Sequence, residues 1–429
     1  MLSMFARSRQ SRRPKSSARA ARLGRVFSAA MATVVAGSAV VALGVTPSSA
    51  APVSGNPPLP GGTGPADDSF YTPPSPLPQG QPGDVIRWRP ARPGPRGAIA
   101  NSWQIMYLSN SALGKPIAVT GTIIMPKSAN PATAPIAAVT SGTQGPAFLC
   151  APSIMEQTGS HYEQPAIDDF IKAGYAIALP DYEGYKPDPK TTYMTGQSMG
   201  RTTLDAVRAA QKFSETKVAA GAKVVLKGYS QGGGAAMWAG QLHPTYAPEL
   251  NLVGVAAGGV PADLVMVGLP LDAKWGSGFF LYALLGLANA YPELDLYSAL
   301  TPAGKAAYDD MSKDSCTFEL LTKYANKKIS DYFTQSVFVT PAWAARLAEN
   351  KLGATPIKVP VYQYHGSADN IVAFGQADTL HKTYCGAGVN LTWKVIPDQD
   401  HITPIYIGNA EAFAFLQDRV AGKPATSNC

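Results

Sequence analysis

The chain has 429 residues, and its 36 basic against 29 acidic residues give a formal charge of +7. Eight of the basic residues lie in the first 50 positions, which hold no acidic residue, so the remainder has 28 basic and 29 acidic residues and a net charge of −1. This near-neutral remainder excludes a nucleic-acid-binding protein, and 45% hydrophobic against 15% charged residues excludes a disordered chain.

The first 50 residues have the layout of a secretory signal peptide. The basic segment is followed by an apolar run over residues 26–45 and then by Ser48-Ser49-Ala50, which places small residues at −3 and −1 of a cut after Ala50. A permanent membrane anchor is disfavoured, because the run is rich in Ala and Gly and ends at a cleavage site. We therefore expect export and removal of residues 1–50.

Residues 51–82 are dominated by Pro and Gly. This composition buries too little apolar surface to order itself, so we expect a flexible leader. Folded structure is expected to begin near Gly83, and Phe70 and Tyr71 are candidates to dock on the folded body.

Beyond the leader, apolar strand patterns alternate with helical patterns, which favours a parallel sheet with helices on both faces. The expected strands cover 85–88, 102–109, 119–125, 136–140, 175–179, 223–226, 252–257, 359–364 and 391–396, and the expected helices cover 166–173, 201–213, 232–241 and 410–420.

The alternation stops over residues 260–358, which have a mainly helical pattern with aromatic and aliphatic runs. Such a block inside an α/β sheet indicates an inserted cap. The expected core therefore has a first part at 83–259 and a second part at 359–429.

Four cysteines lie in the chain, at Cys150, Cys316, Cys385 and Cys429. An even number in an exported chain predicts two disulfides, and three pairings are open. A zinc site is disfavoured because no two cysteines lie within four residues of each other. We expect neither a metal nor a cofactor.

The Gly-x-Ser-x-Gly pattern of a nucleophile elbow occurs twice, at 196–200 and at 228–232. An elbow needs a strand before it and a helix after it, so that the serine sits in a strained turn with its hydroxyl exposed. Ser230 has this context. Ser198 follows a proline-containing segment, so we expect it to be a loop serine ahead of the helix at 201–213.

A serine nucleophile needs a histidine base and an acid that orients it, and in α/β-hydrolases they follow in the order Ser, acid, His. His401 comes after the last expected strand, and Asp369 comes after the strand before it. Asp398 and Asp400 are closer to His401 in sequence but are interpreted as loop groups. His365 is interpreted as a turn residue beside the acid.

The tetrahedral intermediate of ester hydrolysis needs donors for its oxyanion. One expected donor is the backbone N–H of Gln231, directly after the nucleophile. The other is expected from the loop that follows the strand at 136–140, and Gln144 is the favoured residue there.

These residues carry a resemblance to the secretory lipases of the lipase-A type, found in fungi and actinobacteria, over about residues 68–429. The most specific stretches are Asp68-Ser69-Phe70-Tyr71, Cys150-Ala151-Pro152-Ser153, GYAIALPDY at 174–182, LDAVRA at 204–209, the elbow at 228–232, GVPADL at 259–264 and AYPEL at 290–294.

The resemblance implies an α/β-hydrolase core under a helical cap, a triad of Ser230, Asp369 and His401, and hydrolysis of acylglycerols and related esters. It also implies disulfides that join Cys150 to Cys316 and Cys385 to Cys429. Members of the family place an oxyanion-hole residue six positions before the first cysteine. That position is Gln144 here, where the yeast enzyme has an acidic residue.

The sequence thus predicts a secreted, monomeric serine ester hydrolase, a lipase that acts on uncharged esters through an acyl-enzyme and contacts the lipid interface transiently. The same triad would serve an acyltransferase with an alcohol or envelope-sugar acceptor, which is the main alternative. A non-catalytic surface-binding protein is a lesser alternative, because it would not need all three triad groups.

Overall fold

A computed structural model of the chain describes residues 63–91, 94–336 and 340–429. The expected signal peptide, its cut after Ala50 and the first part of the expected leader lie outside the described residues.

The segment 63–82 differs from the flexible leader that its composition suggests. It contains the 3-10 helix η1 (Asp68–Tyr71), in which Phe70 and Tyr71 are fully buried. The Tyr71 hydroxyl lies 2.9 Å from Ser153 Oγ, and the Arg89 guanidinium lies 4.3 Å from the centre of the Phe70 ring. The docked aromatic side chains thus contribute to the order of a segment that is otherwise rich in Pro and Gly.

The core is a nine-stranded sheet in the order β1-β2-β3-β5-β4-β6-β7-β8-β9. β1, β2 and β3 are antiparallel, β3 is antiparallel to β5, and the remaining neighbours are parallel. The strands are β1 (Val85–Pro90), β2 (Ala100–Asn110), β3 (Pro116–Pro126), β4 (Ile136–Thr140), β5 (Ala176–Pro180), β6 (Lys223–Tyr229), β7 (Asn251–Gly258), β8 (Val361–Gly366) and β9 (Leu391–Ile396).

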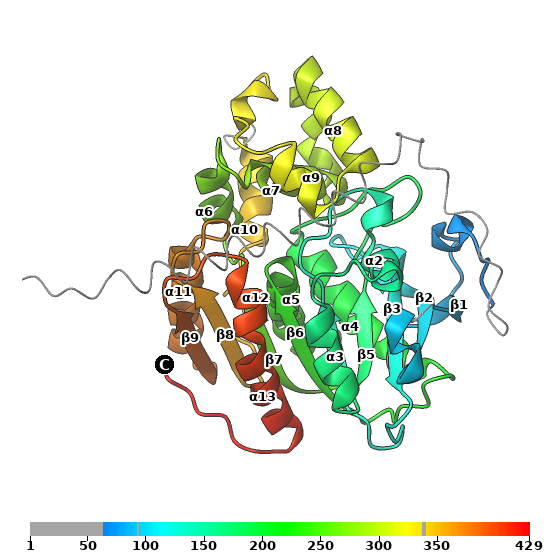
Figure 1. The fold of residues 1–429 in the computed structure, drawn as a ribbon. Coiled ribbons are helices and arrows are strands. Elements are labelled where there is room, and N and C mark those ends of the chain that lie inside the picture. Colours follow the sequence, from blue (N-terminus) through cyan, green and yellow to red (C-terminus); the bar gives the residue numbers. More distant parts are fainter. Residues whose placement is uncertain (1–62, 92–93, 337–339) are drawn as a thin grey trace, which may run out of the picture. The chain divides into compact units, whose positions relative to one another are not determined.

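Helices cover both faces of this sheet, as the alternation of patterns predicts (Figure 1). α4 (Gly196–Lys212) and α5 (Gln231–Tyr246) pack on one face, and α3 (Gln164–Lys172) and α13 (Asn409–Val420) pack on the other. The core also has α2 (Pro152–Thr158), α11 (Phe374–Gly386) and α12 (Thr403–Ile407).

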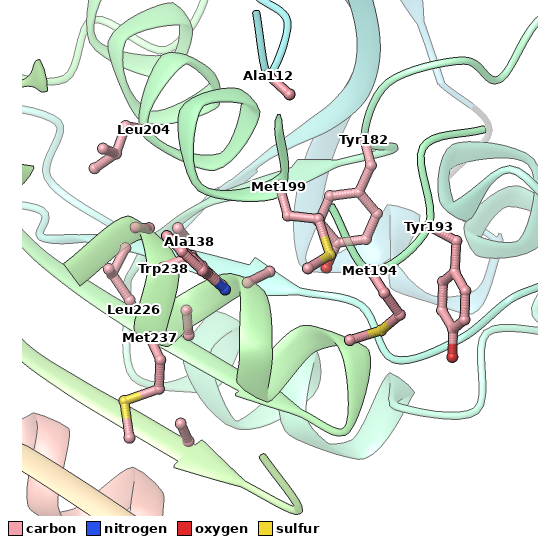
Figure 2. Packing of buried hydrophobic residues seen from close by; sticks show 14 of the residues in the cluster. Ala112, Ala138, Tyr182, Tyr193, Met194, Met199, Leu204, Leu226, Met237 and Trp238 are labelled. Carbon is pink, nitrogen blue, oxygen red and sulfur yellow. The ribbon is translucent and has the colours of Figure 1, made fainter. Parts of the chain in front are cut away.

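Alternate strand residues supply the two cores, because side chains of a strand point to opposite faces. Ala138 and Leu226 face α4 and α5, whereas Val139 and Val225 face α3 and α13. Figure 2 shows the first of these cores, in which Ala138 and Leu226 lie near Trp238 of α5.

Ser198 does not lie in the loop that the sequence suggests. It lies in the first turn of α4, which begins at Gly196, and its side chain is buried. Glycine disfavours helices in isolation, but a Cβ at Gly196 would lie 2.0 Å from Trp238 Cε2. Packing against this tryptophan thus requires glycine at the first position of α4, which begins upstream of the expected start.

The helical insertion lies between β7 and β8, and Figure 1 shows its helices grouped together at the top of the view, above the sheet. Its α-helices are α6 (Leu264–Gly268), α7 (Ser277–Ala290), α8 (Pro302–Asp314), α9 (Thr317–Thr322) and α10 (Pro341–Glu349). We refer to this insertion as the cap. Across the described residues, none of the helices has both the length and the apolar character needed to cross a bilayer.

Candidate active site

Ser230 lies at the sharp turn between β6 and α5. Its backbone has φ 56° and ψ −121°, a strained conformation for a residue other than glycine. A Cβ at Gly232 would lie 1.9 Å from the Thr140 carbonyl oxygen, and one at Gly228 would lie 2.2 Å from the Gly232 carbonyl oxygen. The two glycines therefore allow the elbow to pack directly against the end of β4.

The structure brings together three of the predicted site residues. His401 Nε2 lies 2.9 Å from Ser230 Oγ, and His401 Nδ1 lies 2.7 Å from Asp369 Oδ2. The three come from separate parts of the chain: the end of β6, the loop after β8 and the loop after β9. This is the geometry of a nucleophile, a base and an orienting acid.

Backbone donors fix the Asp369 carboxylate. Its Oδ1 accepts hydrogen bonds from the N–H groups of Ile371 at 2.9 Å and Val372 at 2.7 Å. Burial raises the pKa of Asp369, but the electrostatic interaction with His401 and hydrogen bonds from both His365 and His401 outweigh burial and hold this pKa well below its ordinary value. The carboxylate therefore stays ionised.

His365 lies beside the acid, as the sequence suggests, but it belongs to β8 and not to a turn, and it contacts the carboxylate directly. It is fully buried at the end of β8, with its Nε2 3.1 Å from Asp369 Oδ2 and 2.8 Å from the Val372 carbonyl oxygen. The spacing of four residues between His365 and Asp369 was the available signal.

His401 is held by its backbone as well as by its ring. The Tyr229 hydroxyl donates to the His401 carbonyl oxygen at 2.7 Å, and the two rings lie 5.2 Å apart. Tyr229 directly precedes the nucleophile, so one residue of β6 links the elbow to the backbone of His401.

The alternative candidates for the nucleophile and the acid, Ser198, Asp398 and Asp400, do not hydrogen-bond to the His401 ring in the described residues. Ser198 Oγ donates to Glu183 Oε2 at 2.6 Å, which gives it a half-buried carboxylate and not a histidine as its partner. Asp400 Oδ1 accepts from the N–H groups of Ile402 and Thr403, and Asp398 is exposed. Among the described residues, neither of these two aspartates bonds to the His401 ring.

The two expected oxyanion donors are Gln231, which directly follows Ser230, and Gln144, which lies in the loop after β4. Gln231 is the first residue of α5, where an N–H has no intrahelical acceptor. The backbone N–H of Gln144 donates to no acceptor among the described residues, while its side-chain Nε2 turns back to the Gly142 carbonyl oxygen at 3.4 Å. Backbone N–H groups are thus available for the role, and the Gln144 side chain is directed elsewhere.

A cavity of about 420 Å³ opens beside Ser230 and Gln231. Its walls are mostly apolar and come mainly from α6, α7 and α10 of the cap, with Leu264, Phe280, Leu284, Leu287 and Leu347 among the lining residues. The cavity therefore offers an apolar chain a place directly next to the nucleophile.

Two disulfides link distant parts of the chain. Cys150 pairs with Cys316, which joins the core to the cap, and Cys385 pairs with Cys429. These are the pairs that the resemblance implies. Within the ranges that the structure describes, no group of three or more His, Cys, Asp or Glu side chains is arranged to hold a metal ion.

Comparisons with known proteins find similar sequences among the lipases. A family model described as secretory lipase matches residues 151–428. Lipase 6 of Candida albicans is 32% identical over 85% of this chain and 83% of its own length, and a secreted triacylglycerol lipase, LIP1, of Malassezia furfur is 30% identical over 85% and 77%.

Solved structures show the same fold. Lipase A of Candida antarctica matches with a TM-score of 0.78 at 25% identity, over 84% of this chain and 87% of its own. The cell-wall-degrading esterase LipA of Xanthomonas oryzae matches with a TM-score of 0.63 at 19% identity, over 80% and 97%, which shows likeness of fold alone. The expected α/β-hydrolase fold is confirmed.

Proposed function

The chain belongs to the secretory lipase family, and on that premise we propose that it hydrolyses triacylglycerols and related uncharged esters through Ser230, His401 and Asp369. Membership makes it a hydrolase of the lipase and carboxylesterase class. The observation that carries the proposal is the continuous set of contacts from Ser230 through His401 to Asp369, next to an apolar cavity.

In the proposed first step, Ser230 Oγ attacks the ester carbonyl carbon while His401 Nε2 takes the hydroxyl proton. Asp369 accepts from Nδ1, which keeps Nε2 unprotonated and ready to act as the base. The carbonyl oxygen becomes an oxyanion, for which we propose the backbone N–H groups of Gln144 and Gln231 as donors.

The intermediate then collapses. The bond to the alcohol oxygen breaks, and His401 gives its proton to the leaving alcohol, so that the acyl group stays on Ser230. A water molecule, deprotonated by His401, attacks this acyl-enzyme through a second tetrahedral intermediate. The fatty acid leaves, and the proton returns to Ser230 Oγ.

Substitution of each candidate serine tests the proposal, with p-nitrophenyl butyrate as substrate. We expect Ser230→Ala to lose about 10³-fold or more in kcat, and Ser198→Ala to stay near wild type. A fluorophosphonate probe should label the wild type and Ser198→Ala but not Ser230→Ala. Retained turnover in Ser230→Ala would remove Ser230 from the nucleophile role, and an unlabelled wild type would favour a non-catalytic protein.

The proposed acyl-enzyme would also support transfer to an alcohol. Product analysis with and without an alcohol acceptor separates the two reactions. Free fatty acid as the main product in both cases supports a hydrolase, and dominant formation of a new ester supports an acyltransferase.

We also propose that the protein is secreted after a cut behind Ala50. The family and the two disulfides support export, because disulfides persist in oxidising compartments. Mass spectrometry of the exported protein should find Ala51 at its amino terminus, and an intact signal peptide would contradict the cut.

A further inference from the structure

The loop after β4, residues 141–145, contains the proposed oxyanion donor Gln144, and we call it the oxyanion loop. Its carbonyl groups accept hydrogen bonds from residues of the core and of the cap. The Tyr182 hydroxyl donates to the Ser141 carbonyl oxygen at 2.8 Å, and the Tyr185 hydroxyl donates to that of Gly145 at 2.6 Å. Both ends of the loop are therefore fixed by residues of the core.

The centre of the loop is held from two sides. The Tyr162 hydroxyl, from the core, donates to the Thr143 carbonyl oxygen at 3.3 Å. The Thr317 hydroxyl, from the first residue of α9 in the cap, donates to the same oxygen. The Thr317 backbone N–H donates to the Gln144 carbonyl oxygen at 2.8 Å.

The Thr143 carbonyl and the Gln144 N–H belong to one peptide unit. Because that unit is planar and trans, its C=O and N–H point in opposite directions, and holding one fixes the other. The carbonyl has two hydroxyl donors, while the N–H has no acceptor among the described residues. Hydrogen bonds to the Thr143 carbonyl oxygen thus fix the orientation of this peptide unit, and the Gln144 N–H remains available to a ligand.

Other contacts leave this part of the chain little room to shift. Glu163 Oε2 accepts from the Gly142 N–H at 2.6 Å, and a Cβ at Gly142 would lie 2.2 Å from Tyr162 Oη. Burial raises the pKa of Tyr162 well above its ordinary value, so the phenol keeps the proton that it donates.

We propose that Thr317 is a positioning residue of the oxyanion hole, which acts with Tyr162 through the Thr143–Gln144 peptide. The cap then contributes to transition-state stabilisation as well as to the cavity. This inference rests on the proposed function of Ser230 and Gln144. Thr317 contacts the carbonyl oxygen of this peptide and not the N–H that faces the substrate. Its loss should therefore weaken binding of the tetrahedral state and leave ground-state ester binding unchanged.

Isosteric substitutions test this role. Thr317→Val and Tyr162→Phe each remove one hydroxyl at nearly constant volume, and Thr317→Ser restores the donor. Thr322→Val is the matched control, because Thr322 ends the same helix, is exposed, and donates its hydroxyl to the Phe318 carbonyl oxygen within that helix.

Two quantities are measured for each variant: kcat and KM on p-nitrophenyl butyrate, and the inhibition constant of butylboronic acid, which forms a tetrahedral adduct with a nucleophilic serine. For Thr317→Val we expect kcat to fall about tenfold with KM within twofold, and the inhibition constant to rise by a similar factor. Tyr162→Phe should likewise lower kcat and raise the inhibition constant. Thr317→Ser and Thr322→Val should resemble the wild type.

Several outcomes would overturn the role. One is a folded Thr317→Val enzyme with kcat and boronate inhibition within twofold of the wild type. Another is a loss of kcat without weaker boronate binding, which indicates a structural effect. If Thr317→Val fails to fold, unchanged boronate binding in Tyr162→Phe rejects the positioning of this peptide. Failure of the proposed function is distinguishable, because boronate inhibition would then be absent from the wild type or persist in Ser230→Ala.

Discussion

His365 Nε2 lies 3.1 Å from Asp369 Oδ2, so the acid of the proposed triad faces a second imidazole besides that of His401. Oδ1 accepts from two backbone N–H groups and Oδ2 contacts the two imidazoles, so both oxygens of this carboxylate have polar partners. A carboxylate with such partners is fixed in orientation and stays charged, as an orienting acid must.

Asp369→Asn should therefore lower kcat by about 10³-fold or more on p-nitrophenyl butyrate, with little change in KM. The amide cannot stabilise the imidazolium that forms when His401 takes the proton. Asp398→Asn is the control, because Asp398 is exposed and has a left-handed backbone that Asn also tolerates. An Asp398→Asn enzyme as impaired as Asp369→Asn would reassign the acid.

The cavity predicts a dependence on acyl length. Ala283 of α7 lines it, so Ala283→Leu adds bulk where we expect an acyl chain to lie. The ratio of kcat/KM for p-nitrophenyl palmitate to that for the butyrate should fall about tenfold. Ala306→Leu, an exposed position on α8, provides the control. An unchanged ratio in Ala283→Leu would place the acyl chain elsewhere.

The segment of the cap around α6 has several exposed apolar side chains, at Val265, Met266, Leu269 and Trp275. Exposed apolar groups beside an apolar cavity are typical of a surface that meets lipid. Trp275 does not line the cavity, so Trp275→Ser should lower turnover of emulsified tributyrin several-fold and leave turnover of dissolved p-nitrophenyl butyrate unchanged.

Ile99→Ser tests whether any exposed apolar residue has that effect, since Ile99 is 46% exposed against 40% for Trp275 and lies just before β2 in the core. Two results would count against a lipid-contacting surface at α6. One is an equal loss of tributyrin turnover in the two variants, and the other is a loss of p-nitrophenyl butyrate turnover in Trp275→Ser.

A buried carboxyl group makes stability depend on pH. Asp181 is fully buried after β5 and accepts from the Ser153 N–H at 2.6 Å and the Thr120 hydroxyl at 2.7 Å. Burial raises the pKa of Asp181 from 3.8 to about 6, against the effect of these hydrogen bonds. The folded state then binds the proton more tightly than the unfolded state, so the contribution of Asp181 to stability falls as pH rises from about 4 to about 6.

Urea unfolding at pH 4 and pH 7 measures this contribution. Between those values, the wild type should lose on the order of 2 kcal/mol more free energy of unfolding than Asp181→Asn, which cannot titrate. A parallel pH dependence in the two proteins would show that Asp181 does not have the raised pKa.

Periodicity predicted the core well because each buried strand and amphipathic helix has a local signal. The elbow at Ser230 was predictable for the same reason, since strand, glycines and helix are contiguous. α11 was missed, although Ala377, Leu380 and Tyr384 have helical spacing and are buried on one face. The early start of α4 was also missed; it places Gly196 against Trp238, which lies 42 positions away, and a packing contact over that distance leaves no local pattern.

The surroundings of the triad were harder to predict than the triad itself. The resemblance identified Gln144, but nothing near it in sequence indicates Thr317 or Tyr162 as partners of the adjacent carbonyl. The contact between Thr317 and Thr143 joins residues 174 positions apart. Only the folded cap brings them together.

The attachment of the cap to the oxyanion loop has a consequence for the route by which substrate enters. Three consecutive cap residues, 315–317, join the cap to the core: the Ser315 carbonyl oxygen accepts from the Ala147 N–H, Cys316 is bonded to Cys150, and Thr317 donates to the oxyanion loop. A rigid-body rotation of the whole cap would have to break these contacts. It would therefore disturb the oxyanion loop at the moment when substrate binds. Entry of an ester is therefore expected through local movement of α6, which lines the cavity and takes no part in these contacts, while the rest of the cap stays in place.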